Sequence, residues 1–234
     1  MCGRYGLNAS PAKLRTRFNV PAVPELPFDG QLHNIAPSQQ MPIVRQGKDS
    51  REMALARWGL IPNWAKDAKI GYSLINASAD TVAEKPAYRS AFKRRRCLVA
   101  ADGFYEWKAT GGKVKQPYFI SLKDKEPFGF AGLWEQWDNP EDGKTVESFS
   151  IITTEPNELM APIRNRMPVI LRTQDYSTWL DPEEVPDTLK GLLRPFDAQL
   201  MDAFPVSTYV NSPRNQGEQC RSPLLMANPP PTVP

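Results

Sequence analysis

Proline is the feature that most constrains the fold of this chain. It accounts for 24 of the 234 residues, which is about twice its average usage of roughly 5%. Because proline lacks a backbone N–H and fixes φ, it interrupts helices and removes hydrogen bonds from central strands. We therefore expect short strands joined by rigid turns and no long helices. A chain of this length buries roughly 70% of its unfolded surface, so it needs no covalent or metal staple.

The strand signals lie in segments rich in β-branched or aromatic residues. These segments are residues 41–45, 53–58, 97–101, 118–122, 128–133 and 149–154. They do not alternate with helices in the way that builds a parallel sheet. The pattern predicts an α+β fold, a single domain with an antiparallel, barrel-like β-sheet core flanked by short helices.

The helical signals are short or weak. Ser10-Pro11 is typical of a helix start, with an N-cap residue before a proline at the first helical position. Residues 79–93 and 174–194 carry weaker helical patterns, and residues 21–27 are predicted to form a loop.

We expect the domain to span residues 1–225. Residues 226–234 form a proline-rich tail that has little apolar mass and is expected to be disordered.

Charge and composition exclude several classes of protein. Lys and Arg exceed Asp and Glu by 29 − 26 = 3, an excess that permits nucleic-acid binding without proving it. No apolar run approaches the ~18 residues of a membrane span, and no secretory signal is present, so we expect a cytoplasmic protein that contacts no membrane. The chain has three scattered cysteines and a single histidine, His33. This inventory argues against a metal site and against His-based catalysis, and we expect no cofactor.

Cys2, directly after the initiator methionine, is the most informative residue. Removal of Met1 leaves an α-amine of pKa roughly 7.7–8.0 beside a thiol of pKa about 8.5. Such an aminothiol condenses with an aldehyde: the amine forms a Schiff base, and the thiol closes a five-membered thiazolidine ring. The alternative is that Cys2 is an ordinary residue behind a start codon.

Two further residues are candidates for the same chemistry. Glu106 lies between Tyr105 and Trp107, and a carboxylate between aromatic side chains is expected to be desolvated, with a raised pKa suited to proton transfer. Its alternative is a surface glutamate on an alternating strand. Asn76 ends an apolar stretch, where its amide either binds a ligand or belongs to a plain turn.

A run of four basic residues and two tryptophans are candidates for nucleic-acid contact. Residues 93–96 are all Lys or Arg, and they form either a solvated face or a phosphate-binding surface. The indole rings of Trp58 and Trp64 can stack on bases, although core packing is the stronger interpretation for Trp58. Met167 reads as structural.

Eight short blocks occur along the chain in a characteristic order. They are Cys2-Gly3-Arg4, Asn34-Ile35-Ala36-Pro37, Trp58-Gly59-Leu60-Ile61-Pro62-Asn63-Trp64, Asn76-Ala77, Arg96-Cys97-Leu98, Ala101-Asp102-Gly103-Phe104-Tyr105-Glu106-Trp107, Arg166-Met167-Pro168-Val169-Ile170-Leu171 and Val210-Asn211. Each block alone is weak, but the ordered set resembles the SOS response-associated peptidase family, the abasic-site processing proteins. The resemblance spans roughly residues 2–225.

This resemblance implies a DNA-repair protein with autopeptidase (hydrolase) activity and lyase-type Schiff-base chemistry. It would remove its own Met1 and then form a covalent thiazolidine cross-link through Cys2 to abasic sites in single-stranded DNA, protecting them during the DNA damage response. By similarity, Glu106 is the acid–base residue and assists removal of Met1. Asn76 positions the cysteine or the opened sugar.

The resemblance also assigns residues that bind DNA. Arg4 contacts phosphate, Pro37 and Trp64 shape the cleft, and Arg166 lies beside the lesion. The expected partner is single-stranded DNA containing abasic sites, bound by a monomer that becomes nucleoid-associated on damaged DNA. Two other functions remain open: a thiol peptidase that acts on other proteins, and a non-catalytic single-stranded DNA-binding module.

The sequence departs from the family pattern at several positions. Where relatives carry a histidine just before Arg-x-Pro, this chain has Arg164, which stays protonated and cannot shuttle protons. Ser78 stands in place of a phosphate-binding arginine, with Asp80 as a shorter acid, and Ala65 stands in place of a second cleft tryptophan. His33 is interpreted as a packing residue.

Overall fold

A closed barrel forms the larger part of the computed structural model, which describes residues 2–26 and 32–224. The barrel strands are β3 (Gln40–Gln46), β4 (Arg51–Trp58), β6 (Arg96–Ala101), β9 (Phe128–Asp138) and β10 (Thr145–Thr154). Their order is β10-β4-β3-β6-β9, and the pairing of β9 with β10 closes the ring. Three short strands extend it: β5 (Asn76–Ser78) and β11 (Met167–Pro168) pair with β10, and β12 (Ile170–Leu171) pairs with β9.

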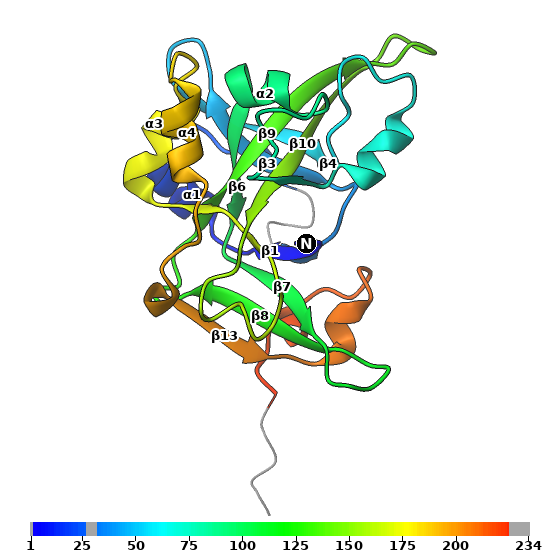
Figure 1. The fold of residues 1–234 in the computed structure, drawn as a ribbon, viewed down its shortest axis with the longest axis vertical. Coiled ribbons are helices and arrows are strands. Elements are labelled where there is room, and N and C mark those ends of the chain that lie inside the picture. Colours follow the sequence, from blue (N-terminus) through cyan, green and yellow to red (C-terminus); the bar gives the residue numbers. More distant parts are fainter. Residues whose placement is uncertain (1, 27–31, 225–234) are drawn as a thin grey trace, which may run out of the picture.

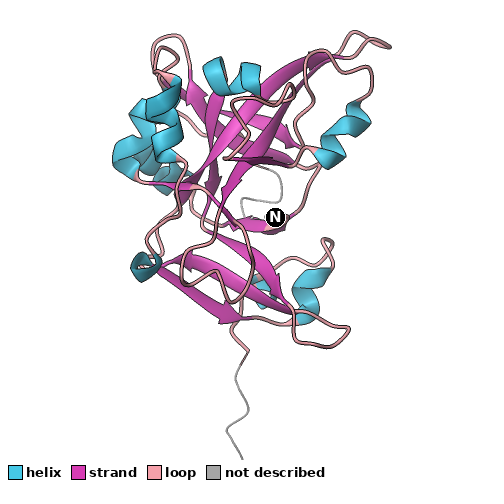
Figure 2. Cartoon of the chain, in the orientation of Figure 1, coloured by secondary structure: helices cyan, strands magenta, loops and turns pink. Residues whose placement is uncertain are grey.

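A second, antiparallel sheet covers one end of the barrel (Figures 1 and 2). Its strands are β1 (Tyr5–Leu7), β2 (Leu32–Ile35), β7 (Gly103–Lys108), β8 (Gln116–Leu122) and β13 (Met201–Pro205), in the order β13-β8-β7-β1-β2. Tyr5 of β1 packs edge-on against Trp58 and Phe130 of the barrel, with ring centroids 5.1 and 6.0 Å away. The two sheets therefore share one apolar core, with β1 at their junction.

The predicted α+β fold with a barrel-like sheet core is confirmed, and each expected strand segment lies within a barrel strand or β8. The barrel is antiparallel except at β10, which runs parallel to β4 and to β5. Trp58 is fully buried and stacks on Phe149, which confirms it as a core residue. Met167 and His33 are buried too, so both packing interpretations are confirmed.

The helices are short. α1 (Pro11–Phe18) begins where the sequence predicts, with the Ser10 hydroxyl accepting a hydrogen bond from the Lys13 N–H at 3.3 Å. The other helical elements are α2 (Arg89–Arg94), α3 (Tyr176–Leu180), α4 (Pro186–Leu192) and the 3-10 turns η2 (Ala68–Ser73), η3 (Thr173–Asp175), η4 (Ala198–Leu200), η5 (Thr208–Asn211) and η6 (Glu218–Cys220).

Of the two weaker helical patterns, the one at residues 174–194 is largely confirmed and the one at residues 79–93 is mostly wrong. Residues 79–93 form turns, and only their last part enters α2. Residues 174–194 form η3, α3 and α4 in place of one helix: α3 ends two residues before Pro182, which cannot continue a helix interior, and α4 begins at Pro186, where proline fits the first helical position. Residues 21–26 carry no helix or strand, as predicted. Residue 27 and the tail at 226–234 lie outside the described residues.

Arg96 departs from both interpretations of the basic run, although Lys93 and Arg94 are exposed, as expected of a solvated face. Its side chain is buried, and its guanidinium donates hydrogen bonds to the main-chain oxygens of Phe92, Lys93, Trp179 and Asp181. It therefore does not face solvent, and four of its five N–H donors are already used within the protein. Arg96 joins α2 and α3 to β6 and holds the helical layer on the barrel.

We expect Arg96→Met to lower the free energy of unfolding by about 3–5 kcal/mol, because it leaves several main-chain carbonyl oxygens without a hydrogen-bond donor. Arg94 is exposed and belongs to the same basic run. Arg94→Met removes the same charge and is the matched control, which should change stability by no more than about 0.5 kcal/mol. Urea unfolding followed by Trp fluorescence measures both. Equal effects of the two substitutions would contradict a structural role for Arg96.

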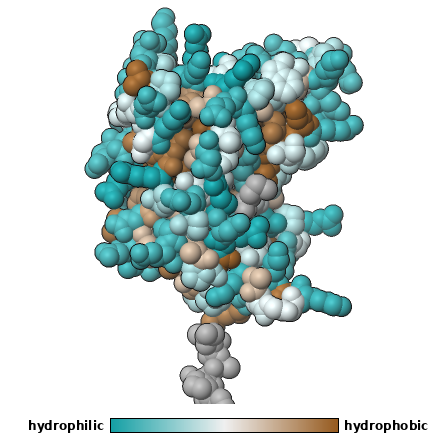
Figure 3. Space-filling model, viewed as in Figure 1, coloured by the Kyte–Doolittle hydropathy of each residue, from teal (hydrophilic) through white to brown (hydrophobic). Residues whose placement is uncertain are grey.

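The surface seen in Figure 3 is mostly hydrophilic, and apolar residues reach it only in small, separate patches. Among residues 2–26 and 32–224, no helix is long and apolar enough to cross a membrane.

Candidate active site

Pairing between β1 and β7 places Cys2 beside Glu106. The register matches Tyr5 with Phe104, and the Tyr105 N–H donates to the Arg4 carbonyl at 2.9 Å. Continuing this antiparallel register by two residues from Tyr5 brings Gly3 opposite Glu106. Cys2 is fully buried. Burial raises the pKa of its thiol, and the charge of Glu106 raises it further, so the thiol is neutral at physiological pH.

Glu106 is a buried carboxyl whose pKa lies near neutrality. Only 3% of the residue is exposed, and burial raises its pKa to about 7. The Arg164 guanidinium opposes this shift, with its Nε 3.6 Å from Glu106 Oε2. The expectation of a desolvated, pKa-shifted carboxyl is confirmed, and the alternative of a surface glutamate is wrong. A carboxyl of this kind can both accept and donate a proton near pH 7.

A pocket of 420 Å³ opens above these groups. Its walls are Gly3, Arg4, Glu106, Trp107, Lys115, Arg164 and Asn211. It collects three cationic side chains and the carboxyl of Glu106. Because the cations outnumber the carboxylate, the pocket favours an anionic ligand such as a phosphodiester.

Arg4 is fixed at the pocket wall. Its Nη1 donates to Asn34 Oδ1 at 2.8 Å and to the Val210 carbonyl at 2.9 Å. Its guanidinium lies over the Trp107 ring, 5.7 Å from the centroid. The arginine is therefore held by two oxygen acceptors on one side, and the cation–π contact keeps its charge beside the pocket.

Asn34 is a residue that sequence reasoning did not single out as part of the site. Its side-chain amide donates to the carbonyls of Val210, Ser212 and Asn215 at 3.2, 3.0 and 2.8 Å, and it is fully buried. These bonds fix the segment that carries Asn211, whose Oδ1 accepts from Trp107 Nε1 at 2.7 Å. The only sequence signal for this role was its place in the Asn-x-Ala-Pro block.

Asn76 stands apart from Cys2 and Glu106 in its contacts. It lies in β5, and its carbonyl accepts from the Tyr88 hydroxyl at 2.9 Å. Its side-chain Oδ1 is buried and accepts no hydrogen bond from any described residue. A buried oxygen without a hydrogen-bond donor destabilises the fold. The Oδ1 of Asn76 can therefore accept a hydrogen bond from a donor on a ligand. The positioning role assigned to Asn76 remains a prediction.

Arg166 is held by Ser78 and Asp80, two of the residues at which the sequence departs from the family pattern. Its Nη1 lies 2.7 Å from Asp80 Oδ2, and its Nη2 donates to Ser78 Oγ at 2.9 Å and to the Thr153 carbonyl at 2.7 Å. Hydrogen bonds from Ser78 and Arg166 lower the pKa of Asp80. The pair Ser78 and Asp80 therefore orients Arg166 instead of adding a second cation.

The predicted cleft residues are partly or fully accessible. Trp64 is 57% exposed, the proportion expected of a ring free to stack. Pro37 is partly exposed. Ala65 is buried against Ile61 and Trp137, so the position lacks both the ring and the exposure of a stacking residue. The DNA-binding roles of Arg4, Pro37, Trp64 and Arg166 stay predictions.

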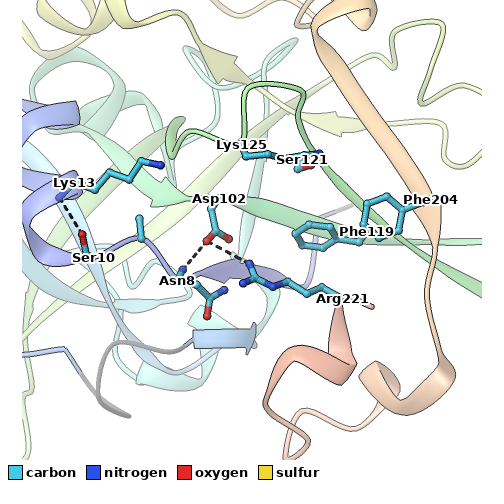
Figure 4. Close-up of a pocket in the computed structure, with 10 residues that line it drawn as sticks. Asn8, Ser10, Lys13, Asp102, Phe119, Ser121, Lys125, Phe204 and Arg221 are labelled. Atoms are coloured by element: carbon cyan, nitrogen blue, oxygen red, sulfur yellow. Dashed lines mark hydrogen bonds and ion pairs between the residues drawn. The ribbon is translucent and has the colours of Figure 1, made fainter. Parts of the chain in front are cut away.

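A cavity of 510 Å³ lies elsewhere (Figure 4). It shares no lining residue with the 420 Å³ pocket at Glu106, which we call the Cys2 pocket because its walls adjoin the buried Cys2. Asp102 Oδ2 accepts from the Asn8 N–H at 2.6 Å and lies 3.7 Å from Arg221. Burial raises the pKa of Asp102. This carboxylate ties the turn between β6 and β7 to the end of β1. None of the predicted site residues lines this cavity. We therefore place the candidate active site in the Cys2 pocket.

No group of three or more His, Cys, Asp or Glu side chains in residues 2–26 and 32–224 is arranged to hold a metal ion.

The sequence of the chain matches a protein-family model. The family model described as SOS response associated peptidase matches residues 1–213. The chain belongs to this family. It is 46% identical over 224 residues to the abasic site processing protein YoqW of Bacillus subtilis, covering 94% of this chain and 98% of that protein. It is 34% identical over 271 residues to the abasic site processing protein HMCES of Gallus gallus, covering 98% of this chain and 80% of that protein.

A solved structure also resembles the fold. A protein from Bacteroides thetaiotaomicron superposes with a TM-score of 0.84 at 30% identity, covering 94% of this chain and all of the other.

Proposed function

We propose that this protein captures abasic sites in single-stranded DNA as a covalent thiazolidine at Cys2, after its own Met1 has been removed. The observation that carries the proposal is the buried Cys2 thiol beside Glu106, a carboxyl of pKa about 7 that lines a pocket together with three cationic side chains. The relatives named as abasic site processing proteins support the substrate class. Captured DNA would be shielded from strand cleavage.

The chemistry balances without a cofactor. The free amine of Cys2 attacks the aldehyde carbon of a ring-opened abasic deoxyribose, and loss of one water leaves an imine. The Cys2 sulfur then bonds to the imine carbon, the π electrons move to nitrogen, and the thiol proton ends on that nitrogen. The net reaction joins an aldehyde to an aminothiol and releases one water, with no change of oxidation state.

Glu106 supplies the proton transfers. As a carboxylate it accepts a proton from the attacking amine or from the neutral thiol, whose pKa is raised by burial. As an acid it returns the proton to the departing hydroxyl. A group with a pKa near the working pH performs both steps with the least penalty. The same carboxyl would activate water for hydrolysis of the Met1–Cys2 bond, so the peptidase activity is confined to the protein's own first residue.

The remaining site residues bind and orient the DNA. Arg4 and Arg164 place fixed positive charge at the pocket, where a phosphate beside the lesion would lie. The unsatisfied Oδ1 of Asn76 accepts a hydrogen bond from a sugar hydroxyl. Trp64 offers an exposed ring to a neighbouring base.

The decisive experiment mixes the protein with a single-stranded oligonucleotide that holds one abasic site. We expect a heat-stable shifted band on a denaturing gel, absent for the same oligonucleotide without the lesion. Binding that is indifferent to the lesion and yields no shifted band would instead support a non-catalytic binding module. Digestion of casein that is lost in Cys2→Ala would support a general thiol peptidase.

Arg164 sets the expected lifetime of the link. Reopening the ring and hydrolysing the imine both need protons delivered in sequence, and a guanidinium 3.6 Å from Glu106 supplies only charge. We expect Arg164→His to release protein from a purified adduct about tenfold faster, because imidazole exchanges protons near neutral pH. Release is measured against an excess of competing abasic DNA. Equal release from both proteins would leave Arg164 with a role in DNA contact alone.

A further inference from the structure

A second hollow of 360 Å³ adjoins the Cys2 pocket. It lies between the β7–β8 hairpin loop and the segment that precedes β11, and its walls are Trp107, Ala109, Lys115, Ala161, Ile163, Arg164 and Asn165. Trp107, Lys115 and Arg164 line both this hollow and the Cys2 pocket. These three side chains therefore form the boundary that a ligand must cross to occupy both spaces.

The boundary carries two cations with unused donors. The Lys115 ammonium, on the exposed hairpin loop, makes no ion pair or hydrogen bond with any residue in the described ranges. Arg164 makes one ion pair, through Nε to Glu106, and its side chain is 38% exposed. No acidic residue lines the second hollow. Two such cations facing one passage favour a single anionic group between them.

We propose that the second hollow is the subsite for the nucleotide next to the lesion, and that the phosphate joining the two nucleotides lies between Lys115 and Arg164. The inference rests on the proposed function, which places the lesion in the Cys2 pocket. Trp107, shared by both spaces, forms their common wall, and Ala161 and Ile163 give the second hollow an apolar side against which a base can pack. Lys115 is a binding residue in this arrangement and takes no part in the covalent chemistry.

The first test measures binding alone. The probe is a single-stranded oligonucleotide with one internal tetrahydrofuran residue, an abasic analogue that has no aldehyde and cannot be captured. We expect Lys115→Ala to weaken binding about five- to tenfold and to reduce the slope of log Kd against log salt by about 0.7, the value for one phosphate contact on a single strand. Lys113→Ala is the matched control, because it removes the same charge from the same loop at a position lining neither space. It should change the slope by less than half as much.

Neutral methylphosphonate linkages identify the phosphate. One probe carries the neutral linkage on the 5′ side of the analogue and another carries it on the 3′ side. We expect one of the two to abolish the effect of Lys115→Ala and the other to preserve it. An effect that persists undiminished with both probes, or equal slopes for wild type and Lys115→Ala, would overturn the proposal.

Ala161→Leu tests the hollow itself by filling it. We expect it to weaken binding of the internal analogue about tenfold, about the cost of displacing a stacked or packed base. A probe whose analogue is the terminal nucleotide on the contacted side has no neighbouring nucleotide to place in the hollow. This probe should therefore bind Ala161→Leu as tightly as it binds the wild-type protein. Equal weakening with internal and both terminal analogues would overturn the subsite. Since no probe reacts, these outcomes are independent of whether natural abasic DNA is captured, and the gel experiment decides that separately.

Discussion

Replacing Glu106 with glutamine is expected to slow covalent capture of an abasic oligonucleotide by about 10²–10⁴, the usual yield of general acid–base catalysis. Glutamine keeps the shape of the side chain but neither accepts nor releases a proton. Removal of Met1 should slow in the same variant if one carboxyl serves both steps. Quenched time courses on denaturing gels give the capture rate, and intact-mass spectra give the state of the N-terminus.

The control is a second buried glutamate that plays no part in the site. Glu135 is 5% exposed and pairs with Arg95 at 2.7 Å. Glu135→Gln therefore removes a buried charge without touching the Cys2 pocket, and capture should proceed at the wild-type rate. A Glu106→Gln protein that captures as fast as wild type would remove Glu106 from the mechanism.

The pH dependence has a definite sign. Because the pKa of Glu106 rises from 4.5 to about 7 on folding, its contribution to stability is fully present below about pH 4.5 and is lost as the pH rises through 7. Glutamine is neutral at every pH, so Glu106→Gln should be more stable than wild type at pH 8, by up to about 3 kcal/mol. The wild-type capture rate should rise through pH 7 as the carboxylate forms, and the variant should lack that inflection. Slow capture by a more stable protein separates catalysis from misfolding.

Local patterns predicted the barrel strands because those segments are rich in apolar and β-branched residues, most of which are buried. β1, β2 and β13 carried little local signal: two have three or four residues, and β13 ends at Pro205. Their pairing depends on contacts distant in sequence. The parallel pairing of β10 with β4 and β5 also leaves no mark on composition, because a buried strand reads alike in either direction.

In the candidate active site too, local sequence patterns predicted some features, and contacts between distant residues determine the others. The aromatic neighbours of Glu106 were enough to predict a desolvated carboxyl. The Arg4–Val210 hydrogen bond spans 206 positions, and no local pattern encodes a contact at that separation. Arg96 shows the opposite error, since four successive basic residues suggested a surface, while its long side chain reaches the carbonyl oxygens of two helices. Charge in a sequence does not reveal which donors tertiary structure consumes.

Retention of Met1 is expected to abolish capture altogether, which is the largest effect we anticipate. An upstream residue converts the Cys2 amine into an amide, whose nitrogen lone pair is delocalised and does not attack an aldehyde. Cys2→Ser separates the two halves of the reaction. Its free amine still forms an imine that borohydride traps, but the heat-stable adduct should fall steeply because an oxazolidine is the weaker ring. The measurement pairs intact-mass spectrometry with the denaturing gel on the same preparation. A fully cross-linking protein that still carries Met1, or a Cys2→Ser protein that forms as much heat-stable adduct as wild type without reduction, would rule out the thiazolidine.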